Sequence, residues 1–223
     1  MSDKFRDRSE AGRRLAQRLA KYADTANVRV LALPRGGVPV AFEIAQALHA
    51  PLDVFLVRKL GVPGQEELAM GAIALGGVRV LNDSVVRMLG IGEATIDRVA
   101  AREEQELVRR DRAYRGDRSA PDVTDCTVIV VDDGLATGAT MRAAVAALRR
   151  LNPRRIVVAV PVGARETCDD LAAEADELVC LASPEPFYAV GLWYQNFLQT
   201  SDDEVRALLR QAETAASAPV TRL

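Results

Sequence analysis

The sequence has little of the chemistry that histidine and cysteine provide. His49 is its only histidine, and its isolation argues against histidine-based triads and histidine-rich metal sites. The three cysteines are odd in number, and none lies within a few residues of another, as paired zinc ligands usually do. We therefore expect Cys126, Cys168 and Cys180 to be buried free thiols.

The sequence also lacks an excess of charge of one sign and a long apolar run. Lysine and arginine number 29 and aspartate and glutamate 31, so no global positive field is available to collect nucleic acid or anionic membrane. No stretch approaches the roughly 18 uninterrupted apolar residues of a membrane helix, and the opening MSDKFRDRSE has no apolar signal core. We expect a cytoplasmic protein with small-molecule ligands and neither nucleic-acid nor membrane partners.

Composition and apolar pattern predict a single α/β domain over residues 1–223. Apolar residues make up 49% of the chain and charged residues 27%, which is enough for one buried core. Strand-like apolar runs alternate with helical patterns, and this predicts a doubly wound, mainly parallel sheet. The predicted strands are 28–33, 52–57, 78–81, 126–131, 155–162 and 177–182, and the predicted helices 9–24, 38–48, 93–114, 141–151, 166–175 and 202–211.

Two segments stand apart from this alternation. Residues 61–77 carry five glycines and a proline around short apolar pieces, so we expect a mobile connection with some strand content. Residues 213–223 form a tail of mostly small residues that we expect to be disordered.

The most informative motif follows the predicted strand VIVV. Asp132 and Asp133 come at the strand end, where carboxylates can accept hydrogen bonds from a sugar diol. The loop after them opens an alanine-rich helix. Gly138 permits close backbone approach, and Thr137 and Thr140 offer hydroxyls beside the free N–H groups at the helix start. These features together predict a phosphate-binding loop. No nucleoside-triphosphate P-loop or dinucleotide fingerprint is present, so a sugar monophosphate fits best.

The segment VVDDGLATGAT resembles the signature of type I phosphoribosyltransferases. An ordinary N-cap aspartate and tight turn would explain one aspartate and one glycine but not the second aspartate or the threonines. The resemblance, which covers residues 28–181, implies that Asp132 and Asp133 face the ribose 2′ and 3′ hydroxyls. It also implies that a five-residue loop wraps the 5′-phosphate: Ala136, Thr137, Gly138, Ala139 and Thr140.

Two further clusters follow strands that should end at the same sheet edge. Arg35, Gly36 and Gly37 follow the first strand, ahead of a helix, and resemble the family's diphosphate loop, whose peptide is often cis. Alone, such a turn is weak evidence. Arg58 and Lys59 follow the second strand, and the resemblance implies that they also face the diphosphate.

The glycine-rich segment, residues 60–77, falls where the family has a flexible catalytic loop. Its only ionisable groups are Glu66 and Glu67, and we assign proton transfer to or from the base to Glu67. The sequence fits equally well with both glutamates lying at a solvent-exposed loop tip, without a role in proton transfer.

The resemblance implies transfer of a phosphoribosyl group from 5-phosphoribosyl 1-diphosphate to a nitrogenous base, with Mg²⁺ held near Asp132 and Asp133 mostly through substrate or water. A non-catalytic regulator that binds the same donor, or a structural subunit, are the alternatives. We also expect a homodimer.

The acceptor base is not determined by these motifs. Hypoxanthine-guanine transferases have an aspartate where this chain has Ala136, which disfavours a 6-oxopurine. A small hood formed by residues 5–25 and 182–200 should contact the base, with Trp193 as the stacking candidate. The competing interpretation is that the hood aromatics only stabilise the hood or a dimer contact. They are Phe187, Tyr188, Trp193, Tyr194 and Phe197.

Overall fold

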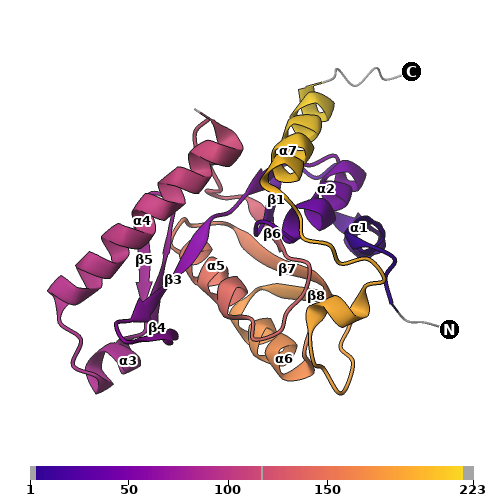
Figure 1. The fold of residues 1–223 in the computed structure, drawn as a ribbon. Coiled ribbons are helices and arrows are strands. Elements are labelled where there is room, and N and C mark those ends of the chain that lie inside the picture. Colours follow the sequence, from indigo (N-terminus) through magenta and orange to yellow (C-terminus); the bar gives the residue numbers. More distant parts are fainter. Residues whose placement is uncertain (1–3, 117, 218–223) are drawn as a thin grey trace, which may run out of the picture.

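A five-stranded parallel sheet forms the centre of the protein, in a computed structural model that describes residues 4–116 and 118–217 (Figure 1). The strand order is β2-β1-β6-β7-β8, and every neighbouring pair is parallel. This confirms the predicted α/β class with a mainly parallel sheet. The strands are β1 (Val28–Ala32), β2 (Leu52–Val54), β6 (Thr127–Val131), β7 (Arg155–Val162) and β8 (Glu177–Ala182).

Helices cover both faces of this sheet. Ile129 and Val131 of β6 pack into the core that contains α1, α2 and α7, whereas Val128 and Val130 pack into the core that contains α5 and α6. Because side chains alternate along a strand, a run that is apolar at every position has to be covered on both sides. The helices are α1 (Arg8–Arg18), α2 (Gly37–Leu48), α5 (Ala139–Arg149), α6 (Arg165–Glu174) and α7 (Asp202–Ser217).

A second, antiparallel sheet was not predicted. It consists of β3 (Val57–Val62), β4 (Gln65–Ala74) and β5 (Val78–Leu81), and it packs against α5 and the long helix α4 (Glu93–Arg115). The short helix α3 (Asp83–Met88) connects β5 to α4. The single strand expected over 52–57 was therefore wrong, because the chain leaves the parallel sheet after Val54.

The glycine-rich residues 61–77 belong mostly to strands. A Cβ atom on Gly71 would lie 2.4 Å from the carbonyl oxygen of Val80 on β5, and one on Gly61 would lie 2.7 Å from that of Glu66. These two glycines allow neighbouring backbones to approach closely, which is a packing role that composition cannot distinguish from mobility. The segment is richer in strand than expected.

The N-terminal segment and the segment after β8 lie side by side. The Phe5 N–H donates to the Trp193 carbonyl at 2.9 Å, and the Gln195 N–H donates back to the Phe5 carbonyl at 2.8 Å. Trp193 ends the 3₁₀ turn η2 (Val190–Trp193). The first helix is shorter than expected: α1 ends at Arg18 and a separate 3₁₀ turn, η1 (Ala20–Tyr22), follows.

The C-terminal helix is longer than expected. α7 continues to Ser217, so the disorder predicted from Glu213 onward is wrong for residues 213–217, where glutamate, threonine and alanine extend the helix. The remainder of that tail, 218–223, lies outside the described residues. No helix in the described part of the chain is long and apolar enough to cross a membrane.

Candidate active site

The acidic pair and the PRGG loop are in direct contact at the carboxyl edge of the parallel sheet. β1 pairs with β6, and the Leu33 N–H donates to the Val131 carbonyl at 2.8 Å where both strands end. A Cβ atom on Gly36 would lie 2.0 Å from Asp133 Oδ2, so only glycine lets the loop lie against this carboxylate. The Pro34-Arg35 peptide in this loop is cis.

The two aspartates have different environments. Asp132 is half-buried and accepts a hydrogen bond from the Asp133 N–H at 2.8 Å. Burial, followed by the adjacent Asp133 charge, raises the pKa of Asp132 well above its usual range. Asp133 instead forms an ion pair with Arg8 of α1, whose Nε and Nη2 both lie 2.8 Å from Oδ2. The pair is therefore not two equivalent carboxylates.

The loop between β6 and α5 is anchored at its base and open at its tip. The Leu135 N–H donates to Val162 and the Ala164 N–H donates to Leu135, both at 2.9 Å. Gly138 adopts a left-handed conformation (φ 69°) immediately before α5. The first N–H groups of a helix have no backbone partner within it and can bind an anion, and here the Ala139 N–H donates to Thr137 Oγ1 at 3.5 Å. The four other residues of the predicted phosphate loop are exposed: Ala136, Thr137, Ala139 and Thr140.

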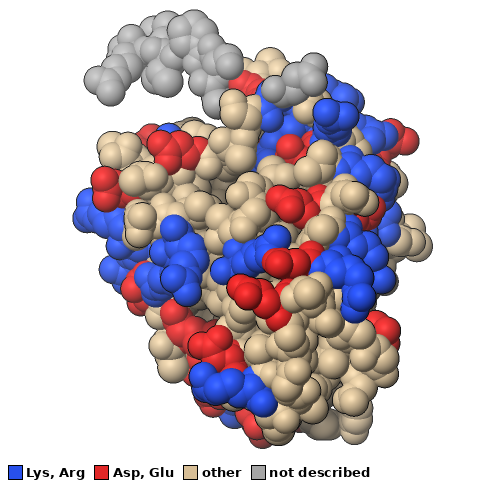
Figure 2. All heavy atoms as spheres, turned by 90° about the vertical axis from the view of Figure 1, so that its left-hand side faces the viewer, with Lys and Arg blue, Asp and Glu red and all other residues tan. Residues whose placement is uncertain are grey.

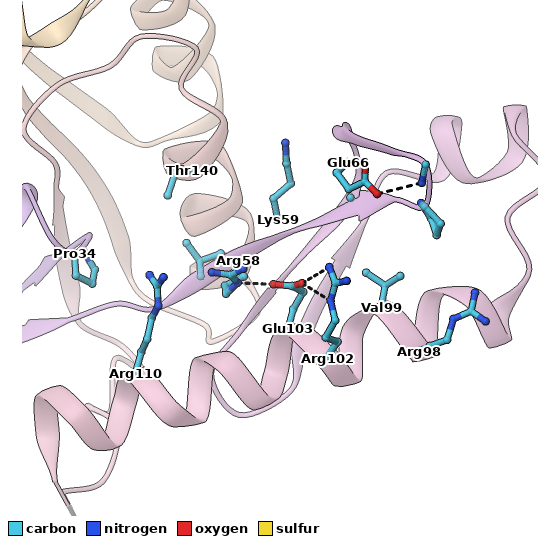
Figure 3. Close-up of a pocket in the computed structure, with 14 residues that line it drawn as sticks. Pro34, Arg58, Lys59, Glu66, Arg98, Val99, Arg102, Glu103, Arg110 and Thr140 are labelled. Atoms are coloured by element: carbon cyan, nitrogen blue, oxygen red, sulfur yellow. Dashed lines mark hydrogen bonds and ion pairs between the residues drawn. The ribbon is translucent and has the colours of Figure 1, made fainter.

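Arg58, Lys59 and Thr140 of the predicted anion clusters line one cavity of about 720 Å³, whereas Arg35, Gly36, Gly37, Asp132 and Asp133 are not among its described lining residues. Pro34 of the PRGG loop and Thr140 of the phosphate loop lie at one end, beside Arg58 and Lys59 (Figure 3). One expectation needs correction: Arg58 and Lys59 lie within β3 of the second sheet, not in a loop after β2. The other lining residues are Val57, Gly61, Pro63, Gly64, Glu66, Arg98, Val99, Arg102, Glu103 and Arg110.

A buried carboxylate on α4 holds Arg58 in place. The Glu103 side chain is 7% exposed and accepts from Arg58 Nε at 2.5 Å and from Arg102 Nη2 at 2.9 Å (Figure 3). Burial by itself raises the pKa of Glu103, but the hydrogen bonds from Arg58 and Arg102 outweigh it and hold this pKa below the usual value. Arg58 is thereby fixed at the wall of the cavity.

The contribution of α4 was missed at the sequence level. Arg98, Arg102 and Arg110 lie on one face of α4 and line the cavity together with β3. Their spacing by multiples of four was a usable signal, but a helix with charges on most faces is ordinarily a solvated one. Figure 2 views the molecule from this side and shows positive and negative side chains intermingled, not one broad positive surface.

Arg35 and Trp193 are not among the described residues that line this cavity. Arg35 Nη1 lies 3.8 Å from Asp202 Oδ1 at the start of α7. Trp193 packs in the hood against Phe5 and Tyr194, and its Nε1 is buried with no hydrogen-bond partner among the described residues. The side chain of Glu67 lies outside the described part of the structure, although its backbone belongs to β4.

The Tyr194 ring belongs to the hood interior and is 4% exposed. Its hydroxyl donates to the Asp133 carbonyl at 2.6 Å, and its ring centroid lies 5.0 Å from that of Phe197. Burial, followed by the Asp133 charge, raises the pKa of Tyr194. These contacts favour a structural role for Tyr194, as the competing interpretation of the hood aromatics proposed.

Parallel strands β1 and β6 end in a glycine loop and an acidic pair, and this defines an α/β protein whose candidate site lies at the carboxyl edge of its sheet. The chain belongs to the phosphoribosyl transferase domain family, whose family model matches residues 4–189. This confirms the resemblance seen in the sequence.

Individual relatives agree with this assignment. Two proteins of Mycobacterium tuberculosis, from strains CDC 1551 and H37Rv, are provisionally named phosphoribosyl transferases; each is 53% identical over 208 residues, or 93% of this chain and 47% of the relative. The chain thus spans about half the length of the curated relatives it matches. The solved TT1426 protein of Thermus thermophilus is 43% identical with a TM-score of 0.85, covering 93% of this chain and 98% of that one. The AQ2163 protein of Aquifex aeolicus shares the fold alone, at 12% identity, a TM-score of 0.50, and coverage of 82% and 78%.

Proposed function

We propose that this protein is an enzyme that transfers the phosphoribosyl group of 5-phosphoribosyl 1-diphosphate to a nitrogen atom of a base and releases diphosphate. The observation that carries the proposal is the contact between the PRGG loop and Asp133, where a Cβ atom on Gly36 would lie 2.0 Å from Oδ2. This contact brings a candidate diphosphate loop to the candidate ribose acid. The family membership of residues 4–189 supports the same chemistry.

Each part of the donor has a candidate binding group. The loop from Ala136 to Thr140 would bind the 5′-phosphate. Asp132 and Asp133 would form hydrogen bonds with the ribose hydroxyls. Gly36 would offer its backbone N–H group to the diphosphate, whereas the Gly37 N–H already donates to the Leu33 carbonyl at 3.1 Å. The cavity wall adds the Arg58 and Lys59 cations. A glycine at 37 is required by packing as well, since a Cβ there would lie 2.6 Å from the Val131 carbonyl oxygen.

This arrangement suits the charge changes of the reaction. The bond from ribose C1 to the diphosphate oxygen breaks, and the bond from C1 to a nitrogen of the acceptor base forms. The proton on that nitrogen passes to a proton-accepting side chain. Positive charge develops on the sugar ring near the aspartates, and negative charge develops on the leaving group near Arg58 and Lys59. Glu67 stays our proposal for the proton acceptor.

The oxygen ligands offered by the substrate and by the two aspartates suit Mg²⁺, which would bind here mainly together with the substrate. No cluster of three or more histidine, cysteine, aspartate or glutamate side chains suited to a metal occurs within residues 4–116 and 118–217. Asp132 and Asp133 are the candidate ligands, through the ribose hydroxyls or water. Mg²⁺ commonly keeps several waters and takes substrate phosphate oxygens, and when bound here it would neutralise diphosphate charge.

The test is base-dependent diphosphate release. The protein is incubated with phosphoribosyl diphosphate, Mg²⁺ and a broad panel of bases, and diphosphate is measured. Asp132→Asn with Asp133→Asn should remove both release and donor binding, whereas Asp122→Asn, at an exposed site, should leave both unchanged. Magnesium-dependent donor binding without release on any base would favour the non-catalytic regulator instead. Unaltered donor affinity in the double variant would refute the site.

The assembly state stays a prediction. We expected a homodimer from the sequence, and sedimentation velocity at micromolar concentration tests it directly. The same panel of bases identifies the acceptor, because Trp193 and its hood neighbours do not by their contacts select one base.

A further inference from the structure

An arginine at the start of α1, in the N-terminal part of the hood, binds the side chain of the candidate ribose acid. Arg8 Nε and Nη2 both lie 2.8 Å from Asp133 Oδ2, and Nη1 donates to the Leu198 carbonyl at 2.7 Å. The Arg8 guanidinium also lies 4.0 Å from the centre of the Phe197 ring. The guanidinium N–H groups therefore bind both Asp133 of the core and Leu198 of the hood, while one face of the guanidinium lies against the Phe197 ring of the hood.

This ion pair is shielded from water. The side chains of Arg8 and Asp133 are 11% and 16% exposed. Asp7 caps α1 by accepting from the Glu10 N–H at 2.8 Å, which fixes the backbone from which Arg8 extends. A planar guanidinium that forms several bonds from a fixed backbone position has little freedom to turn, and neither does its carboxylate partner.

The two carboxylate oxygens of Asp133 have different surroundings. Oδ2 is bound by Arg8 and lies against Gly36, and the backbone carbonyl accepts from the Tyr194 hydroxyl at 2.6 Å. Within the described part of the chain no N–H group donates to Oδ1, while the Asp133 carboxyl group also interacts with the Asp132 carboxyl group. Arg8 therefore makes the two oxygens of one carboxylate different, because Oδ2 is held by the guanidinium and Oδ1 is not.

We propose that Arg8 is a positioning residue of the donor site: it holds Asp133 through Oδ2 so that Oδ1 meets the ribose hydroxyls, and it thereby couples the hood to donor binding. This inference rests on the proposed function, since it assigns the ribose to Asp133. Arg8 touches no donor atom itself. It also places a positive charge beside two adjacent aspartates, whose mutual repulsion would otherwise turn Asp133 away from Asp132.

The proposal predicts a selective loss of affinity for the ribose-containing ligand. Partners that orient a ligating group typically contribute about 10–100-fold in affinity or activity. We expect Arg8→Gln to weaken Mg²⁺-dependent binding of phosphoribosyl diphosphate by this amount. Binding of inorganic diphosphate, which does not reach the ribose acid, should change less than about twofold. A general loosening of the hood would affect both ligands alike.

The experiment measures both ligands by calorimetry on four proteins: wild type, Arg8→Gln, Arg8→Lys and the control Arg6→Gln. Arg6 lies two residues away and pairs with Asp7 at an exposed position, so its variant should bind both ligands as wild type does. Arg8→Lys keeps the charge but loses the planar fork, so its donor affinity should lie between wild type and Arg8→Gln. It also serves if Arg8→Gln does not fold.

Three results would overturn the proposal. They are wild-type donor affinity in both Arg8 variants, an equal loss for donor and inorganic diphosphate, and no recovery in Arg8→Lys relative to Arg8→Gln. Failure of the wild-type protein to bind phosphoribosyl diphosphate at all would instead refute the proposed function. The wild-type titration therefore separates the two failures.

Discussion

Replacing Glu103 with glutamine should cost the protein both stability and affinity for the donor's diphosphate. A glutamine side chain has one neutral oxygen that can accept a hydrogen bond from Arg58 or Arg102. The substitution therefore removes the negative charge that strengthens the hydrogen bonds of this buried cluster. Hydrogen bonds to charged groups contribute about 1.5–3 kcal/mol each. Because the Arg58 side chain is 33% exposed and the Arg102 side chain 75% exposed, solvent screens part of this. We expect a loss of about 2 kcal/mol in the free energy of unfolding.

Two measurements check the expectation. A loss of about 2 kcal/mol should lower the melting temperature by roughly 4–8 °C for a chain of this size, and urea unfolding should give the same free energy. Donor affinity should fall as well, because Arg58 is no longer fixed at the cavity wall. Glu104→Gln is the matched control: the neighbouring glutamate lies outside the Arg58 cluster and should be within about 0.5 kcal/mol of wild type.

The pH dependence of Glu103→Gln follows from the lowered pKa of Glu103. A carboxyl group with a lower pKa in the folded protein contributes stability above its unfolded pKa, and loses it as the pH falls through the folded value. The difference between wild type and Glu103→Gln should therefore be largest near neutral pH and shrink in acid. A difference that stays constant down to pH 3, or a glutamine variant as stable as wild type at pH 7, would refute this account of the Arg58 cluster.

Two further predictions concern the acidic pair. Gly36→Ala should abolish donor binding, measured by calorimetry, because the methyl group would lie 2.0 Å from Asp133 Oδ2; Gly92→Ala, with open space around it, should bind normally. Asp132→Asn should remove donor binding but raise the free energy of unfolding at pH 7 by about 0.5–2 kcal/mol. The pKa of Asp132 is raised in the folded protein, so ionisation of this carboxyl group destabilises the fold as the pH rises above the pKa of the unfolded state. A urea titration showing Asp132→Asn to be less stable than wild type at pH 7 would contradict this.

The parallel core was predictable because its signals are local. A strand buried on both faces is apolar at every position, as in VIVV, and the helix after it is marked by glycine and alanine. The same holds for Asp132 and Asp133, because carboxylates directly after a buried strand can only lie at its exposed end. The PRGG loop and the phosphate loop were placed correctly at one sheet edge for the same topological reason.

The second sheet was not predictable in the same way. Gly61 and Gly71 suit a flexible loop and a tightly paired strand equally, and only the partner strands decide between these. The division of LDVFLV between two sheets likewise depends on where the chain turns after Val54. Short apolar runs do not carry this information.

The roles of the charged residues depended most on tertiary contacts. Local patterning was sufficient to identify the fold class, the acidic pair and the glycine loops, because backbone geometry and burial act over a few neighbouring residues. It was not sufficient for Arg8, which meets Asp133 across 125 residues, or for Glu103, which meets Arg58 across 45. A surface arginine and a buried, paired arginine have the same sequence signature, since the difference is the water that packing removes around them.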